Sequence, residues 1–457
     1  MYELTIFDFL AALLWITIIG IYSYFHVHFK IKKKPQYKYY LYGLYAKIFG
    51  GICFGFIYAF YYEYTGDTFT YYRDIQKLTT FFYSETINVI KTIFQEVDTF
   101  NPDTYHITSQ IFFFRGADTF MVVRVCTIIN FLGFNTYLGT TVILSYLSFL
   151  GIWKLFLLFE SYYPEIRYKL AIAILYFPSV IFWGSGILKD SIVIGCMGFM
   201  LYYLNELILK GRISIVSWAI LLSAIFITSQ TKAYVIISLL PATALWIVPS
   251  MRKKIKNKAI KIFIAPVLII SSFFIAFLMI NYFSSVFERF SIDNALDTAK
   301  VYQDWHYIDG DTERSGRGSS YTLGDYSPTI MSMISMIPAG INVALFRPYI
   351  WEIRNAVMAM AAFESLFVLI LTLTIIIKTG IIQLLKTIIS NPFIQMCVIF
   401  SLFFAFAVGF SSYNFGALVR YKIPCIPIYI SALFILLHIK EKEKDKFIAT
   451  NKTPFQK

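Results

Sequence analysis

Residues 5–25 read TIFDFLAALLWITIIGIYSYF, and this apolar run decides the fold class. A helix of about 20 such residues crosses the hydrocarbon core of a bilayer. No basic stretch precedes the run, and a basic block follows it, formed by Lys30, Lys32, Lys33, Lys34 and Lys38. This order is the reverse of a cleavable signal peptide, so we expect the run to remain as a membrane anchor with its N-terminus outside.

Comparable apolar runs recur along the 457 residues, of which 58% are hydrophobic, 19% aromatic and 15% charged. This composition is typical of membrane proteins. Spanning helices satisfy their backbone hydrogen bonds internally, whereas a membrane barrel would show alternating segments of about ten residues. The sequence therefore predicts an all-α, polytopic helical bundle.

The net charge of +13 comes from short basic blocks that lie between apolar runs. Such blocks are topology signals, and they do not form the basic soluble face of a nucleic-acid-binding protein. With the blocks placed in the cytoplasm, eleven spans are predicted, N-terminus out and C-terminus in. They lie near 5–25, 41–63, 137–159, 169–187, 191–209, 214–230, 233–250, 262–283, 355–378, 393–411 and 423–439.

Two long segments of this single membrane domain fall outside, at 64–136 and 284–354. The first is too apolar for a free loop, and its stretches Glu85 to Phe94 and Thr119 to Leu132 are predicted to be interfacial helices. The five cysteines and five histidines show no metal-ligand spacing, so no dedicated metal site or disulfide framework is predicted.

The first candidate site follows the second span, where the sequence runs from Tyr64 to Asp74. A carboxylate such as Asp67, beside aromatic residues and Arg73, could act as a general base on a hydroxyl nucleophile. The alternative is that Gly66 and Asp67 only form a turn. Asp67 or Asp74 could also hold a divalent cation together with substrate phosphates.

Two further candidates lie in short outer turns. Pro and Gly break the chain before Lys189 and Asp190, and Lys232 falls between two spans. Lys189 could bind a lipid-linked phosphate, and Lys232 could bind an anion. The alternatives are that Lys189 pairs with Asp190 and that Lys232 extends towards the membrane surface.

The remaining candidates lie towards the C-terminus. Arg347 could clamp a phosphate and Trp351 could stack on a sugar, or Arg347 could simply pair with Glu352 in an aromatic belt. Arg314 and Arg317 belong to a basic stretch that is either a substrate contact or a linker. Arg420 and Lys422 open the last span from outside, so they need an acidic partner in the protein or an anionic ligand.

This arrangement resembles the GT-C membrane glycosyltransferases. The resemblance rests on Asp67 after a span, on interfacial helices in the first outer loop, and on the closing stretch from Arg420 to Pro424. The stretches Trp183 to Asp190 and Leu345 to Trp351 are similar to Wzy-type polysaccharide polymerases.

The GT-C resemblance implies a polyprenyl-phosphate or polyprenyl-diphosphate-linked sugar donor and an acidic residue, here Asp67, that activates the acceptor. Arg347, Arg420, Lys189 and Lys232 would then stabilise the departing phosphate. Asp74 is a candidate for the family's second acidic residue. The Wzy resemblance instead implies a role for outer-loop arginines, and Arg314 and Arg317 fit it.

We therefore expect a multi-pass inner-membrane glycosyltransferase or polymerase of envelope polysaccharide, with its active site on the outer side. Expected partners are the lipid-linked donor, a glycan acceptor, membrane lipids and other polysaccharide-assembly proteins, and not nucleic acid. The alternatives are a flippase of lipid-linked glycans and a noncatalytic scaffold. A transporter would carry charges at mid-bilayer, whereas the predicted spans are nearly free of charge, Glu206 and Glu364 being among the few exceptions.

Overall fold

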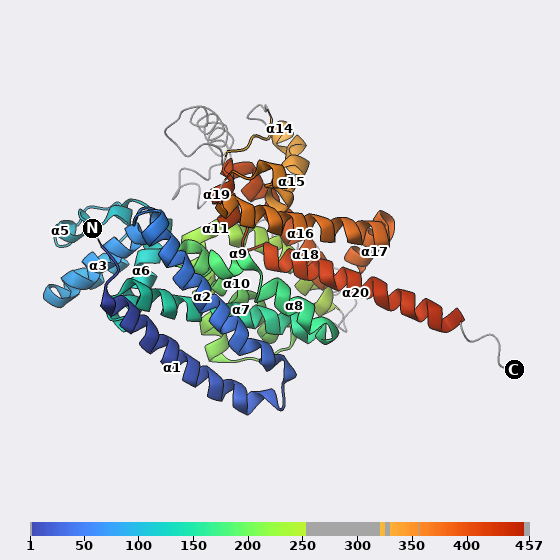
Figure 1. The fold of residues 1–457 in the computed structure, drawn as a ribbon, viewed down its shortest axis with the longest axis horizontal. Helices are drawn as coiled ribbons and strands as arrows, with labels where there is room; N and C mark the ends of the chain where they lie inside the picture. Colours follow the sequence, from blue (N-terminus) through green and yellow to red (C-terminus); the bar gives the residue numbers. More distant parts are fainter. Residues whose placement is uncertain (1, 253–319, 325–329, 355, 452–457) are drawn as a thin grey trace. The chain divides into compact units, whose positions relative to one another are not determined.

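The computed structural model describes residues 2–252, 320–324, 330–354 and 356–451. Within these ranges the chain is helical and has no β-strand (Figure 1). The described residues cluster into two compact units, which consist of Met1–Tyr162 with Ile174–Ala233 (unit 1) and Tyr163–Ala173 with Tyr234–Lys457 (unit 2). The predicted all-α class is confirmed for this part of the chain.

Seven helical stretches of the described residues are long and apolar enough to cross a membrane. They are Ile6–Ile31, Pro35–Tyr61, Tyr137–Tyr162, Lys189–Leu209, Ile215–Arg252, Met358–Thr379 and Pro392–Ser412. The pair Phe415–Tyr421 and Ile426–Asp445, bent by 66°, would make an eighth. These helices are those of a multi-pass membrane protein, as the sequence predicts.

Among the described residues, the candidate spans differ from the predicted ones at particular places. The predicted span 169–187 consists of two short helices, α8 (Arg167–Ile174) and α9 (Pro178–Phe182). The predicted spans 214–230 and 233–250 form one 38-residue stretch, α11 (Ile215–Arg252), which is broken at Lys232, where φ is −143° and ψ is 73°. The predicted span 262–283 lies outside the described residues.

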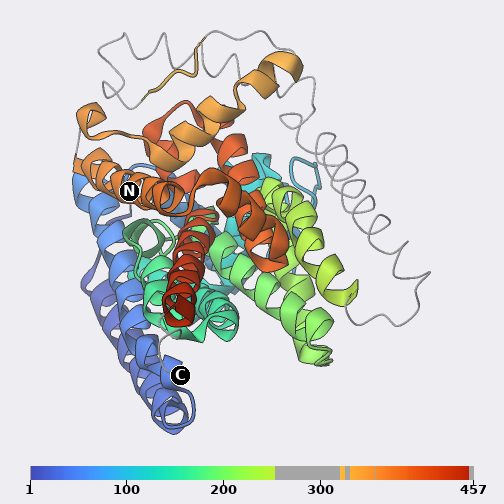
Figure 2. The ribbon, with the colours of Figure 1, turned by 90° about the vertical axis from the view of Figure 1, so that its right-hand side faces the viewer.

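Unit 1 begins with α1 (Ile6–Ile31) and α2 (Tyr40–Phe56), which is flanked by η1 (Pro35–Tyr39) and η2 (Ile57–Tyr61). The two long helices lie side by side and antiparallel (Figure 2). At one end the Tyr64 hydroxyl lies 3.3 Å from the Leu4 nitrogen, and near the other the rings of His26 and Tyr40 are 5.5 Å apart. The basic block therefore lies at the turn of this hairpin.

The first long outer segment is helical. It contains α3 (Asp67–Ser84), α4 (Thr86–Phe94), α5 (Tyr105–Thr108), η3 (Phe112–Arg115) and α6 (Ala117–Leu132). The two predicted interfacial stretches coincide with α4 and α6, and their position in a membrane interface stays a prediction. Helix α3 was not predicted. It forms because its apolar residues recur every three or four positions, with Phe69, Tyr72, Ile75 and Leu78 buried on one face.

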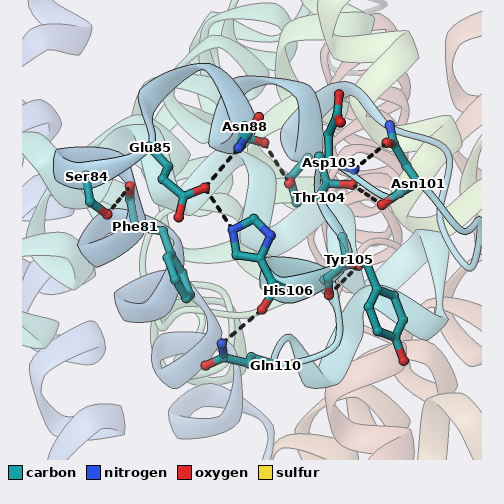
Figure 3. A network of polar contacts seen from close by, with 12 residues as sticks. Phe81, Ser84, Glu85, Asn88, Asn101, Asp103, Thr104, Tyr105, His106 and Gln110 are labelled. Atoms are coloured by element: carbon teal, nitrogen blue, oxygen red, sulfur yellow. Dashed lines mark hydrogen bonds and ion pairs between the residues drawn. The ribbon is translucent and has the colours of Figure 1, made fainter.

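A polar network holds the connection between α4 and η3 (Figure 3). Asn88 Nδ2 donates to Glu85 Oε2 at 2.9 Å, and His106 Nε2 lies 2.8 Å from the same oxygen. The hydrogen bond from Asn88 and the contact with His106 lower the pKa of the Glu85 carboxyl. Gln110 donates to the His106 carbonyl at 2.9 Å, and the contact of His106 with Glu85 holds α5 against the start of α4.

Helices α7 (Tyr137–Tyr162) and α10 (Lys189–Leu204, continued by η5, Asn205–Leu209) are parallel and touch through glycines. A Cβ at Gly198 would lie 2.0 Å from the Gly151 carbonyl oxygen. Farther along, Tyr162 donates to Asn205 Oδ1 at 2.9 Å. Small residues let membrane helices approach this closely. Because α7 and α10 are parallel, the chain that connects them must run in the opposite direction to both.

Residues 175–188, called the return segment below, run in this opposite direction and lie alongside α2. The contacts pair Tyr176 with Tyr39, Ile181 with Gly50, and Gly186 with Phe54. The order of these contacts shows that the return segment and α2 run in the same direction. Residues 183–188 are all buried, and only α9 is helical within the segment.

Side chains supply the hydrogen bonds that a continuous helix would have made. Lys47 Nζ donates to the Val180 carbonyl at 2.9 Å, and Ser145 Oγ donates to the Ser185 carbonyl at 2.7 Å. Likewise, Ser148 bonds to Gly184 at 3.2 Å and Ser191 to Gly186 at 2.6 Å. Buried irregular backbone is stable only when its polar groups are paired in this way.

Unit 2 contains η4 (Pro164–Ile166), α8, the second part of α11, and the C-terminal helices. These are α14 (Ile330–Ser335), α15 (Ile337–Phe346), η7 (Ile350–Glu352), α16 (Ala356–Thr379), α17 (Ile381–Ser390), α18 (Pro392–Ser412), α19 (Phe415–Tyr421) and α20 (Ile426–Asn451). Asn391 and Asn414 cap α18 and α19, because each side chain accepts from two backbone N–H groups.

Candidate functional site

Asp67 is exposed in the first turn of α3, directly after the chain leaves η2. Gly66, with φ of 87°, makes the turn that precedes it. A negative side chain is favoured at this end of a helix. The bend therefore lies at Gly66, whereas Asp67 belongs to the helix and is exposed.

Asp74, two turns farther along α3, is almost fully buried, with 1% exposure. Its two oxygens accept hydrogen bonds from Phe112 N at 3.0 Å and Phe113 N at 2.8 Å. Burial raises the pKa of the Asp74 carboxyl, although these bonds act in the opposite direction. Asp74 therefore fixes the start of η3 and does not share the exposure of Asp67.

Arg73 lies between these two acids but makes local contacts. Its guanidinium donates to the Phe69 carbonyl at 3.3 Å and to Thr70 Oγ1 at 3.0 Å. Both acceptors belong to the preceding turn of α3, so the described contacts of Arg73 are with its own helix.

Four charged residues of unit 1 form two ion pairs, called the charge cluster below. Lys189 pairs with Asp118, in the first turn of α6, and Lys232 pairs with Asp190 at 2.5 Å. The sequence-based alternative of a pair between Lys189 and Asp190 is not what the structure has. Instead, each of these neighbours pairs with a residue from another helix.

Two aromatic residues lie between the end of the return segment and the turn that precedes Asp67. A Cβ at Gly186 would meet the Phe54 ring at 2.1 Å, and one at Gly66 would meet the Tyr58 ring at 2.6 Å. The Phe54 and Tyr58 rings are 4.6 Å apart. The ends of the return segment and of the 62–66 turn therefore lie against one aromatic pair, at the same end of α2.

In unit 2, Arg347 is held by Glu352 and by aromatic rings. Its Nε lies 3.0 Å from both carboxylate oxygens of Glu352. Its guanidinium carbon lies 5.2 Å from the ring centre of Phe415 and 5.9 Å from that of Tyr321. Partial burial alone would raise the pKa of Glu352, but the hydrogen bonds and charge of Arg347 hold it below its usual value.

Trp351 is 81% exposed and stacks on Tyr349, with ring centres 4.8 Å apart. A stacked, exposed aromatic pair presents a flat apolar face, which suits a sugar ring or a membrane interface equally well.

Lys422 is buried at the end of α19 and donates to Ser365 Oγ at 3.1 Å. Its ammonium also lies 3.4 Å from the Arg347 carbonyl oxygen, and the charge of buried Glu364 acts on it. Arg420 lies in the last turn of α19, two residues away.

The predicted residues that the structure describes are divided between the two units. Unit 1 holds Asp67, Arg73, Asp74, Lys189, Asp190 and Lys232, and unit 2 holds Arg347, Trp351, Arg420 and Lys422. Arg314 and Arg317 lie outside the described residues. Among the described residues, no group of three or more His, Cys, Asp or Glu side chains could hold a metal ion.

Sequence reasoning missed three charged residues that the structure uses. Asp8 is fully buried and accepts from Tyr137 N at 2.7 Å, which caps α7. Lys47 holds the return segment, and Asp118 pairs with Lys189. Asp8 and Lys47 could have been found as lone charges inside apolar runs, which usually have a buried partner or a functional role.

Comparison of the chain with protein-family models, with curated proteins and with solved structures finds no match. The arguments for function therefore rest on the chemistry of these residues.

Proposed function

We propose that this protein is a membrane glycosyltransferase or polymerase of cell-envelope polysaccharide that uses a polyprenyl-phosphate or polyprenyl-diphosphate-linked sugar donor. The observation that carries the proposal is the exposed Asp67 carboxylate, which starts α3 beside the aromatic pair that also contacts the return segment. A base at the mouth of a helix bundle can meet a lipid-anchored donor and a soluble acceptor.

In the proposed reaction Asp67 accepts the proton of an acceptor hydroxyl as that oxygen attacks the anomeric carbon. The new C–O bond forms while the bond from the sugar to the lipid phosphate breaks, and the phosphate leaves with the electron pair. Direct displacement inverts the configuration at the anomeric carbon. The burial of Asp74 and its two backbone hydrogen bonds favour Asp67 as the base.

The departing phosphate gains negative charge in the transition state, and cations stabilise it. Lys189 is the candidate of unit 1 for this role, and Lys232 with Asp190 supports its position. Arg347, Arg420 and Lys422 are the alternative candidates for this role, in unit 2, where Trp351 is a candidate stacking surface for sugar. Arg73, Arg314 and Arg317 complete the proposed binding residues, and a divalent cation held by Asp67 and substrate phosphates is an alternative to them.

We further propose the predicted orientation, with eleven crossings, the N-terminus outside and the active site on the outer side of the inner membrane. Two observations support it. Parallel α7 and α10 require a crossing between them, and the return segment, although it is not a continuous helix, follows α2 in the required direction. The turn between α1 and α2 also carries the first basic block, as a cytoplasmic loop should.

The experiment compares Asp67→Asn with Glu63→Gln, a second exposed acid four residues earlier. Membranes that contain each variant are supplied with a pool of polyprenyl-linked sugars, and the glycan products are measured by mass spectrometry. Asp67→Asn should abolish product at unchanged abundance in the membrane, whereas Glu63→Gln should retain it. Full activity of Asp67→Asn would remove Asp67 from the mechanism.

A flippase of lipid-linked glycans is the second candidate, and Lys47 specifically favours it. Lys47 lies within the candidate span Pro35–Tyr61, is 2% exposed and bonds to an interrupted helix. Buried charges and broken helices inside the membrane are common in transporters. Vesicles that contain purified protein separate the two functions, since only a flippase would move lipid-linked glycan between leaflets without changing its length.

A further inference from the structure

The two ion pairs of the charge cluster differ in how easily another ion can replace one of the partners. Asp190 and Lys232 are 1% and 5% exposed, whereas the side chains of Asp118 and Lys189 are 41% and 17% exposed. A buried ion pair is costly to separate, because each charge is left without water or a partner. A partly exposed pair is held only weakly against water and other ions. In the pair of Asp118 and Lys189, another ion can therefore replace a partner more easily than in the buried pair.

The hydrogen bonds of this pair leave donors of Lys189 available to a different anion. Among the described residues, the Asp118 carboxylate is the only acceptor of a hydrogen bond from Lys189, whose ammonium carries three donors. Asp118 itself has a second anchor, since its Oδ1 accepts from Thr119 N at 2.9 Å at the start of α6. Asp118 can thus release Lys189 and still keep its charge stabilised by the end of its own helix.

The surroundings of Lys189 suit an anion with several oxygens. Arg115 is exposed and lies three residues before Asp118, so it adds positive charge to the same end of α6. Lys189 is itself the first residue of α10, where the helix favours negative charge in front of it. The buried ion pair of Asp190 and Lys232 anchors the first turn of α10 to α11.

We propose that the Asp118 carboxylate occupies the position of a substrate phosphate, and that a phosphate group of a polyprenyl-linked lipid displaces it to bind Lys189. The phosphate chemistry follows from the charge cluster. The assignment to a lipid source rests on the proposed function.

Binding of a short-chain polyprenyl phosphate to the purified full chain in detergent tests the proposal. Asp118→Asn removes the competing carboxylate and should tighten binding by about fivefold, which corresponds to the strength of a partly exposed ion pair. Lys189→Gln removes the charged donor and should weaken binding by about tenfold or more. Asp103→Asn, which breaks the exposed pair of Asp103 with Lys91, is the matched control and should change nothing.

The opposite signs of the two variants distinguish a phosphate site from an ordinary structural ion pair. Equal weakening of binding by Asp118→Asn and Lys189→Gln would overturn the proposal. So would unchanged binding in both variants, provided that both unfold at the same temperature as the parent. Inorganic phosphate is the second probe. Binding as tight as that of the polyprenyl phosphate would overturn the lipid assignment and retain the phosphate site.

Failure of this proposal and failure of the proposed function are separable. The activity of Asp67→Asn tests the proposed base, whereas phosphate binding by Asp118→Asn and Lys189→Gln tests the phosphate site, so the two readouts are independent. If Asp67→Asn retains full activity while the two charge variants still show opposite signs, the phosphate site stands and the proposed base is wrong.

Discussion

The Lys232 ammonium donates a hydrogen bond of 2.5 Å to Asp190 Oδ1, and this bond joins the break in α11 to the first turn of α10. The boundary between the two units follows immediately, after Ala233. A buried lysine therefore lies at the point where one helix is interrupted and one unit ends.

Lys232→Met should be strongly destabilising, because it leaves Asp190 buried without its ammonium partner. The expected cost is about 3–5 kcal/mol, measured by unfolding in detergent. Replacing both residues, with Asp190→Leu added, should recover most of the loss, since an apolar pair carries no desolvation penalty. The control Lys91→Met breaks a pair whose side chains are 46% and 60% exposed and should cost less than about 1 kcal/mol. Equal costs for the two single variants would contradict the buried geometry.

Ser145→Ala should destabilise the return segment, because the Ser185 carbonyl then loses a buried donor. The expected cost is about 1–3 kcal/mol. Ser229→Ala is the matched control, since Ser229 bonds to the Phe226 carbonyl at an exposed site. Thermal unfolding of both variants measures the difference, and a loss in Ser229→Ala as large as that in Ser145→Ala would argue against a special role for the interrupted backbone.

Gly198→Ala should push α7 and α10 apart, because the added methyl group would lie 2.0 Å from the Gly151 carbonyl oxygen. Overpacking of this kind typically costs about 1–3 kcal/mol. Cys196→Ala, on the same helix but without this contact, should be much milder. We expect a lower unfolding temperature and a lower yield of folded protein for Gly198→Ala and not for Cys196→Ala. Stability of Gly198→Ala equal to that of the parent would rule out the close glycine contact.

Glu352 should make unit 2 sensitive to acid. Arg347 holds the pKa of the Glu352 carboxyl in the folded protein below its value in the unfolded chain. The pair therefore stabilises the protein at pH values above the pKa of the unfolded state. This stabilisation is lost as the pH falls through the pKa of the folded state. Unfolding measured from neutral pH to below about pH 4 should therefore show a steeper loss for the parent than for Glu352→Gln. Parallel curves for the two proteins would show that this carboxylate does not contribute.

The helices with the longest apolar runs were predictable from the sequence. Burial in lipid rewards about 20 apolar residues in a row, and this pattern is local, so α1, α7, α16 and α18 lie close to their predicted ranges. The break at Lys232 was also predictable, because a lone lysine between two apolar stretches signals an interruption.

The return segment could not be read in the same way. Its apolar composition resembles that of a helix, but Pro178 and the glycines after it prevent one, and its carbonyls are satisfied by Lys47 and by serines of α7 and α10. Lys47, Ser145 and Ser148 lie far from the segment in the sequence, so no local pattern could have identified them.

Sequence alone determined that this protein is a helical, multi-pass membrane protein and that charged residues gather beside its spans. Only the tertiary structure decided which charges meet. Lys189 and Asp190 are neighbours in the chain, yet Lys189 pairs with Asp118 of α6 and Asp190 with Lys232 of α11. The physical reason is that hydropathy is a property of each segment by itself, whereas an ion pair depends on how different segments pack.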